Sequence, residues 1–221
     1  FKAPSLYQLY DASVGNISLM PERSITAEAG LQYFSKSKKW NSRLVFFARD
    51  IKDGIDFSFV DFRYFNNNRQ KDKGLEFEFA YRTKKWQFTQ NYTFVTGEVN
   101  TTKYVYDPNI FSYIPDGDTT YNNLFRRPKH SMNLGVSFQA TEKLFLRVSG
   151  RFIGKRFEPR FMESPIKLEA YQTTDLYGEY RVFKKNILFL DLKNIFNTSY
   201  FDLAGFNTRR RNFMAGIRVG F

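Results

Sequence analysis

The final stretch of the chain, from Arg209 to Phe221, alternates between apolar residues and residues of other kinds. The apolar positions are Phe213, Ala215, Ile217, Val219 and Phe221, and the positions between them are Met214, Gly216, Arg218 and Gly220. A period of two residues predicts a β-strand with two different faces. Because the termini of water-soluble domains usually fray, a strand that ends on phenylalanine indicates a terminus held in an apolar environment.

The middle of the chain holds the clearest hairpin pattern. Leu75 to Tyr81 and Trp86 to Phe94 are apolar at most alternate positions, and Arg82 to Lys85 form a polar turn between them. A carboxylate facing hydrocarbon is strongly disfavoured. Glu76 and Glu78 are therefore expected to face inward if the aromatic residues face lipid. A soluble β-sandwich with Phe and Tyr in its core is an alternative that this hairpin alone leaves open.

The same alternation predicts about nine strands. They are expected near residues 25–33, 40–49, 75–81, 86–94, 132–138, 144–152, 174–182, 188–193 and 209–221. Which residues of the second strand face which side is ambiguous, because Leu44 to Phe47 is apolar throughout.

The predicted connections alternate between short turns and long segments. Short turns are expected near Ser35, Arg82, Ala140 and Phe183, and long connections at Lys52 to Asn68, Gly97 to Arg127, Lys155 to Glu169 and Asn197 to Thr208. Bacterial outer-membrane barrels have this rhythm, with short periplasmic turns and long external loops. It predicts a periplasmic C-terminus and an external opening loop, Phe1 to Arg23.

An odd strand count does not close a single-chain bacterial barrel, since these barrels have even numbers of strands. We therefore interpret residues 1–221 as the C-terminal portion of one larger barrel domain. The missing part is expected to supply the neighbours of both edge strands.

Composition supports a membrane barrel over a membrane helix. Aromatic residues make up 19% of the 221 residues, with 26 Phe and 14 Tyr, although the mean hydropathy is only −0.50. No run approaches the ~18 apolar residues of a membrane helix. Barrel strands alternate lipid-facing and lumen-facing residues and so look polar on average. The predicted fold class is all-β, an antiparallel transmembrane β-barrel segment.

The formal net charge of +12 bears on the partners. The lysines cluster in short turns rather than along one groove, at Lys36, Lys38, Lys39, Lys84, Lys85, Lys184 and Lys185. This placement favours outer-membrane lipid as a partner and no nucleic acid. The absence of cysteine excludes disulfide and Cys-based metal or redox chemistry. A first residue other than Met indicates a removed leader or a piece of a longer polypeptide.

Three parts of the chain resemble TonB-dependent outer-membrane receptors. In the opening loop and the next strand the matching residues are Phe1, Lys2, Ala3, Pro4, Ser5, Leu6, Leu9, Tyr10, Gly15, Asn16, Leu19, Pro21, Glu22, Glu28 and Gly30. Gly74, Leu75 and Glu76 are similar to a recurrent strand start of the family. The last hairpin matches at Asn194, Ile195, Phe196, Asn197, Tyr200, Arg211 and Phe221. The basic run from Asn207 to Arg211 departs from the Gly-Arg that the family often carries there.

The resemblance implies a barrel of about 22 strands filled by an N-terminal plug, and opened by a periplasmic TonB-type energy-coupling protein. It implies active uptake of a scarce, bulky nutrient in a Gram-negative outer membrane, with cobalamin (vitamin B12) narrowly favoured over a ferric siderophore. The plug, the remaining strands and the coupling protein are expected partners, a surface lipoprotein is an optional one, and no resident cofactor or enzymatic activity is expected. A smaller outer-membrane barrel that acts as an enzyme or adhesin through its external loops is the alternative.

The candidate ligand-binding residues are the aromatic residues of the longest predicted external loop. External loops carry recognition on a rigid scaffold, and tyrosine offers an apolar face with a polar tip. These candidates are Tyr104, Tyr106, Phe111, Tyr113 and Tyr121. An aromatic girdle at the membrane interface is the other interpretation of the same residues.

A second group of candidates is predicted to face the lumen. It consists of Glu76, Glu78, Arg147, Arg151 and Arg218. These side chains either line a transport path or form pairs with one another or with the absent plug.

Metal and catalytic sites find little support in the sequence. Asp107, Asp116 and Asp118 lie in one loop and could hold Ca²⁺, but turn formation is the commoner role of aspartates in such a loop. His130 is the only histidine, so it is interpreted as a rim residue rather than a catalyst, and no metal site is predicted.

Overall fold

A computed structural model describes residues 1–58, 62–160, 164–183 and 185–220, which form one ten-stranded antiparallel sheet and a separate short hairpin. The path across the sheet is β1 (Arg23–Phe34), β2 (Trp40–Ser58), β3 (Arg63–Arg82), β4 (Trp86–Asp107), β6 (His130–Gln139), β7 (Leu144–Ile153), β10 (Tyr171–Arg181), β11 (Ile187–Lys193) and β12 (Asn212–Arg218). The tenth strand, β5 (Ser112–Tyr121), pairs with the far end of β4. The hairpin consists of β8 (Arg156–Glu158) and β9 (Ile166–Leu168).

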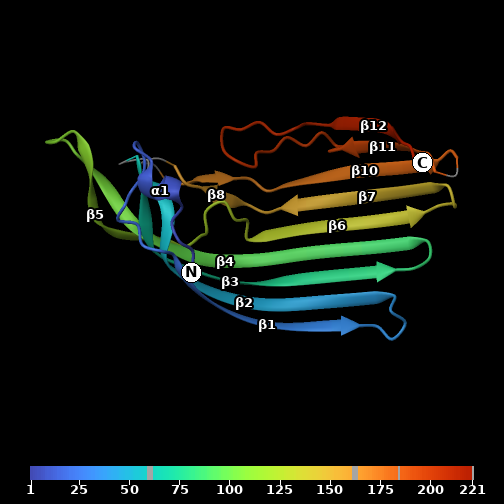
Figure 1. The fold of residues 1–221 in the computed structure, drawn as a ribbon, viewed down its shortest axis with the longest axis horizontal. Helices are drawn as coiled ribbons and strands as arrows, with labels where there is room; N and C mark the ends of the chain where they lie inside the picture. The colour runs from blue at the N-terminus through green and yellow to red at the C-terminus, as the bar shows by residue number, and fades with distance from the viewer. Residues whose placement is uncertain (59–61, 161–163, 184, 221) are drawn as a thin grey trace.

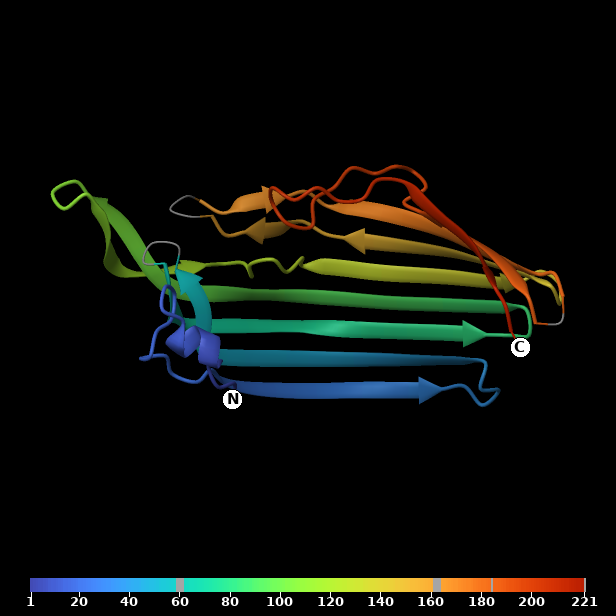
Figure 2. The same ribbon diagram turned by 45° about the horizontal axis from the view of Figure 1, so that its top comes forward.

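The described sheet is an open, curved wall (Figures 1 and 2). Its path ends at β1 and β12, which do not pair with each other in the described residues. The short turns lie at one end of the wall, and the longer connections and the β4–β5 hairpin lie at the other (Figure 1). The all-β prediction of a barrel segment with about nine successive strands is confirmed.

One face of the wall is apolar and exposed. Pairing aligns apolar side chains across consecutive strands, namely Leu31, Leu44, Phe77, Tyr92 and Met132. Leu31 is 77% exposed and Ile217, on β12, is 67% exposed. A contiguous apolar face of this kind is required of a wall whose surroundings are lipid.

Aromatic rings line the short-turn end of this apolar face. Trp40 lies 4.8 Å from Tyr33 and 6.3 Å from Phe79, measured between ring centroids. Further along, Trp86 stacks on Phe138 at 4.2 Å. The row has the composition and position of the aromatic girdle that barrels place at a membrane interface.

The structure shows which residues of β2 lie on which face of the sheet. Leu44 and Phe46 share the apolar face, so Val45 and Phe47 point to the other, inner face. Both fit there because glycines stand opposite them on the neighbouring strands: Val45 pairs with Gly30, and Phe47 pairs with Gly74.

Two of the predicted long connections are largely wrong. Most of Lys52 to Asn68 is strand, because β2 continues to Ser58 and β3 begins at Arg63. Much of Gly97 to Arg127 is the β4–β5 hairpin. β3, with 20 residues, and β4, with 22, are about twice the 9–11 residues that a tilted strand needs to cross a bilayer. Beyond that length both faces contact water. The alternation of apolar and polar residues therefore disappears there, although the strands remain paired through their backbones.

The other two predicted long connections contain little strand. Lys155 to Glu169 holds the short β8–β9 hairpin, and residues 161–163 fall outside the described part. The connection from β11 to β12 contains no strand. The expectation for Phe221, the last residue, also lies outside the described residues.

The opening segment packs against the start of β3. It contains α1 (Leu6–Tyr10), whose first turn is closed by a capping box between Ser5 and Gln8. The Asn16 side chain donates a hydrogen bond to the Tyr64 carbonyl oxygen at 2.9 Å. No described helix is long and apolar enough to cross a membrane.

Candidate functional site

The face opposite the apolar one is mainly polar. Strand pairing places Arg43, Glu78, Asn91, Asn133, Arg151 and Thr173 in one row across β2, β3, β4, β6, β7 and β10. Because directly paired residues of neighbouring strands share a face, this row defines the inner face.

All five residues predicted to face the lumen lie on this inner face by strand pairing. Glu78 accepts a hydrogen bond from Arg43 at 3.3 Å, and Glu76 pairs with Thr93. In the described residues, no ion pair joins two of the five predicted residues.

Arg218, one of those five, lies on β12 within 3.8 Å of Glu179 on β10. Its neighbour Ile217 is therefore on the apolar face. This orientation avoids the cost of a guanidinium that faces hydrocarbon, about 2–4 kcal/mol at the midplane of a bilayer.

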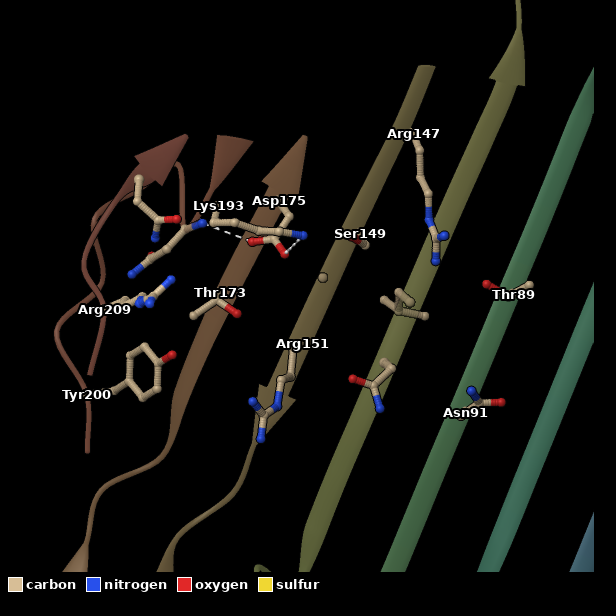
Figure 3. A pocket seen from close by; sticks show the side chains of 15 residues that line it. Thr89, Asn91, Arg147, Ser149, Arg151, Thr173, Asp175, Lys193, Tyr200 and Arg209 are labelled. Carbon is tan, nitrogen blue, oxygen red and sulfur yellow. Dashed lines mark hydrogen bonds and ion pairs between the residues drawn. The ribbon is translucent and has the colours of Figure 1, made fainter. Parts of the chain in front are cut away.

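A hollow of about 560 Å³ lies over the inner face (Figure 3). Arg147 and Arg151 enter it from β7, Lys193 from β11 and Arg209 from the segment after β11. Among the described residues that line it, Asp175 is the only carboxylate, and it accepts a hydrogen bond from Lys193 at 3.2 Å. Lys193 also lies 3.2 Å from Asp191, and Arg151 lies 4.0 Å from Asp202. The four cations still exceed these three carboxylates, and this excess of positive charge favours polar or negatively charged groups.

One wall of the hollow is formed by residues 194–211, here called the β11–β12 segment. The Tyr200 ring stacks on the Tyr171 ring of β10, with 4.1 Å between the centroids. The Tyr171 hydroxyl donates to Asp202, and Arg156 donates to the Phe201 carbonyl oxygen. These contacts hold the segment against the inner face rather than out in solvent.

Arg156 is a residue that the sequence interpretation missed. It is 4% exposed, and its Nη1 has no hydrogen-bond partner in the described residues. Its guanidinium also lies 5.5 Å from the centre of the Tyr171 ring, in cation–π geometry. Its position in a predicted loop gave no signal, because the contacts arise only when the β11–β12 segment folds back.

A second missed residue is Asp72 on β3, whose side chain is fully buried. Its Oδ2 accepts hydrogen bonds from Arg49 at 2.8 Å, from Gln70 at 2.9 Å and from Arg127 at 3.4 Å. Arg127 belongs to the segment between β5 and β6, so this carboxylate fixes a connecting segment to the inner face.

Arg126, the residue before Arg127, contacts the β8–β9 hairpin instead of β3. Its Nε lies 2.6 Å from Glu158 of the β8–β9 hairpin, and its backbone N–H donates to the Phe157 carbonyl oxygen at 2.8 Å. Two neighbouring arginines therefore connect β3 and the β8–β9 hairpin to the same segment.

The five aromatic ligand candidates lie on the β4–β5 hairpin and are divided among three places. The Tyr106 and Tyr113 rings meet edge to face at 5.2 Å, and strand alternation puts Tyr104 on their side. Tyr121 pairs with Val99 on the opposite face and contacts Phe125 at 5.1 Å. A register shift after Thr102 accounts for this division.

Phe111, the fifth candidate, is in the turn of the hairpin and is 82% exposed. The structure therefore brings Tyr104, Tyr106 and Tyr113 to one side, and leaves Tyr121 and Phe111 apart from them.

The aspartates of the same region have local partners. Asp107 accepts the backbone N–H of Asn109 at 2.8 Å, and Asp116 lies 2.6 Å from Lys103. In the described residues, no three of the His, Asp and Glu side chains come close enough to hold a metal ion. His130 begins β6, where its Nδ1 shares a 2.8 Å hydrogen bond with the Tyr92 hydroxyl.

Comparison with known proteins identifies the family. The sequence model described as "TonB dependent receptor-like, beta-barrel" matches residues 1–197. The chain belongs to the TonB-dependent receptor β-barrel family. The predicted membership of the TonB-dependent receptor family is thereby confirmed, and the wall described above is part of such a barrel.

A curated relative and several solved structures are similar to the chain. The vitamin B12 transporter BtuB of Vibrio cholerae is 25% identical over 227 aligned residues, which cover 100% of this chain and 33% of the transporter. The chain thus spans about a third of this relative.

Among solved structures, the ferric-catecholate import receptor Fiu of E. coli K12 has a TM-score of 0.72 at 21% identity, over 98% of this chain and 30% of Fiu. The copper transporter OprC has a TM-score of 0.73 at 16% identity, over 100% of this chain and 36% of OprC. At these identities the likeness shows the fold alone.

Proposed function

We propose that the protein to which this chain belongs is a TonB-dependent importer of the Gram-negative outer membrane, and that this chain forms part of its barrel wall. The observation that carries the proposal is a family match over residues 1–197 on a wall with a bare apolar outer face and a polar inner face. Such a wall separates lipid from a polar passage. The C-terminal end of the chain is periplasmic in this proposal, because it lies on the side of the short turns.

The cargo that we propose first is cobalamin, with a ferric siderophore second. The first choice is supported by the B12 transporter of V. cholerae, to which the whole chain aligns. The second is supported only by a shared fold with siderophore receptors such as PiuA of Acinetobacter baumannii, which has a TM-score of 0.73 at 18% identity, over 89% of this chain and 28% of PiuA. The family assignment does not favour the alternative of a small enzymatic or adhesive barrel.

The partners follow from this function. A plug is expected inside the barrel, and a TonB-type protein is expected to deliver energy through it. The positive hollow lined by Arg147, Arg151, Lys193 and Arg209 would then face either the plug or the passing cargo.

Uptake by intact cells tests the proposal. We expect deletion of the full-length gene to reduce uptake of radiolabelled cobalamin to background, and we expect dissipation of the proton gradient to do the same in cells that keep the gene. A loss confined to ferric siderophore uptake would replace the cargo. Unchanged uptake of both compounds in the deletion strain would overturn the proposed function.

A further inference from the structure

The outer face of β1 to β4 changes from apolar to basic along the strands. On β3 the outward residues from Tyr81 to Leu75 are aromatic or aliphatic, and the next outward residues are Lys73, Lys71 and Arg69. Pairing places Arg23 and Lys52 in the same row as Arg69. A basic region therefore adjoins the apolar face at its long-loop end.

A groove of about 620 Å³ lies at this boundary. Ile25 and Ala27 of β1, Ala48 of β2 and Thr96 of β4 line it together with Lys71 and Lys73. The row of Ala27, Ala48, Lys73 and Thr96 is one step from the row of Ala29, Phe46, Leu75 and Phe94. Small side chains beside bulky ones leave the surface hollowed there, and the floor is apolar.

The charges around the groove do not balance. The outward-facing charged residues that line it are Lys71, Lys73, Asp50 and Glu98, and the next outward row adds three cations, Arg23, Lys52 and Arg69. Arg69 pairs with Asp50, and Lys71 lies 3.8 Å from Glu98. Within the described part of the chain, Arg23, Lys52 and Lys73 have no carboxylate within ion-pair distance. The rim is thus suited to a group with negative charge.

The depth of the groove in the membrane follows from the length of the apolar stripe. Between Leu75 and Tyr81, β3 has fewer residues than the roughly 9–11 that a tilted strand needs to cross the hydrocarbon. Lys73, at the next outward position, therefore lies at the edge of the hydrocarbon. A lysine there is tolerated when its stem lies on apolar surface and its ammonium group reaches the headgroup layer.

We propose that this groove binds a phosphate-bearing lipid of the surrounding membrane. One acyl chain lies over Ala27 and Ala48, and the phosphate lies between the ammonium groups of Lys71 and Lys73. Charge complementarity and the combination of an apolar floor with a basic rim select this occupant over a neutral lipid. The proposal depends on the family fold and not on the identity of the cargo. A failure of lipid binding and a failure of the proposed uptake can therefore be told apart.

The headgroup contact is tested by native mass spectrometry of the full-length protein in neutral detergent, titrated with phosphatidylglycerol or with phosphatidylcholine of the same acyl chains. We expect preferential binding of phosphatidylglycerol. The double variant Lys71→Gln/Lys73→Gln should weaken that binding about tenfold or more, because attraction of each lysine to an anionic headgroup contributes separately. The matched control Lys155→Gln/Lys167→Gln, with one lysine just before β8 and one on β9, should leave it unchanged, because both lysines lie beside Glu169 and away from the groove.

The acyl contact needs a variant that keeps the charge. Ala48→Leu fills the groove, and we expect it to weaken phosphatidylglycerol binding although both lysines remain. Added inorganic phosphate should not displace the lipid at equal concentration. Three results would each overturn the proposal. They are equal binding by the wild type and the Lys71→Gln/Lys73→Gln variant, an equal loss in the Lys155→Gln/Lys167→Gln control, and full displacement by phosphate with no effect of Ala48→Leu. Heat-dependent gel migration checks that every variant is folded.

Discussion

The ring of Phe47 lies over the backbone of Gly74 on the inner face of the wall. A Cβ atom at Gly74 would stand 2.7 Å from Cζ of Phe47 and 2.1 Å from the carbonyl oxygen of Phe94. Both distances are shorter than any side chain allows. Glycine at this position therefore lets an aromatic residue point inward from β2 without pushing β3 and β4 apart.

Gly74→Ala is expected to destabilise the barrel by about 1–3 kcal/mol, because the added methyl group forces strain into a packed region. Urea unfolding of the full-length protein in detergent measures this change. Gly150→Ala is the matched control, since the nearest atom to its Cβ would be the Thr173 carbonyl oxygen at 4.0 Å. The double variant Phe47→Ala/Gly74→Ala should not recover full stability, because the clash with the Phe94 carbonyl oxygen remains. Full recovery would show that the ring alone imposes the glycine.

Asp72→Asn is expected to cost about 3–5 kcal/mol of stability, the range for removing one partner of a buried ion pair. The substitution leaves Arg49 and Arg127 without their shared carboxylate. Glu78→Gln removes a pair with Arg43 in which both side chains are about half exposed, so its cost should stay within about 1 kcal/mol. The same urea titration compares the two variants. Equal costs would contradict the assignment of Asp72 as a buried anchor.

Tyr200→Ala is expected to release the β11–β12 segment from the inner face. An aromatic pair contributes about 0.5–1.5 kcal/mol, so the open state should become roughly two to ten times more populated. Trypsin cleavage at Arg209 to Arg211, followed by mass spectrometry, reports that population. Tyr180→Ala, on β10 near the short-turn end, should leave the cleavage rate unchanged. Insensitivity of the rate to Tyr200→Ala would mean that the other contacts suffice to hold the segment.

The β4–β5 hairpin offers a test of the ligand candidates with an internal comparison. If cobalamin is the cargo, as proposed above, we expect Tyr106→Ala and Tyr113→Ala to weaken its binding to the full-length protein about tenfold each, as is typical of an aromatic contact at the centre of an interface. Tyr121→Ala, on the other face of the hairpin, should have a smaller effect. Equilibrium binding of labelled cobalamin to outer-membrane preparations measures all three. A larger loss for Tyr121 would place the ligand on the opposite face.

The sequence predicted the fold well where lipid borders the strand on one side. From Leu75 to Tyr81 every outward residue is apolar, because each contacts hydrocarbon, and the pattern identified the strand without further information. The same rule could not assign the parity of Leu44 to Phe47, since Val45 and Phe47 also pack on apolar or glycine surface. Beyond Lys73 the rule fails, because both faces are polar there, and the strand is held by backbone hydrogen bonds and by ion pairs to β2 such as Arg49–Asp72.

The candidate site was less predictable than the wall. Alternation placed Arg147 and Arg151 on the inner face, because it requires only a local pattern. Asp72 and Arg156 acquire their partners from segments that lie far away in sequence, namely Arg127 for Asp72 and Phe201 and Asp202 for Arg156. No local pattern contains that information. The division of the hairpin tyrosines was missed for a related reason, since a single extra residue in β5 reverses the faces.

The two adjacent arginines between β5 and β6 have a mechanical consequence. Arg127 is fastened to the rigid wall at Asp72, and Arg126 is fastened to Glu158 of the β8–β9 hairpin. A displacement of that hairpin therefore pulls on β3 through a single peptide unit, and the two regions are expected to move together. We expect Asp72→Asn to speed amide hydrogen exchange in the β8–β9 hairpin, although no atom of Asp72 bonds to it. The connections at the long-loop end of this wall would then respond to a bound molecule as one coupled layer rather than as separate loops.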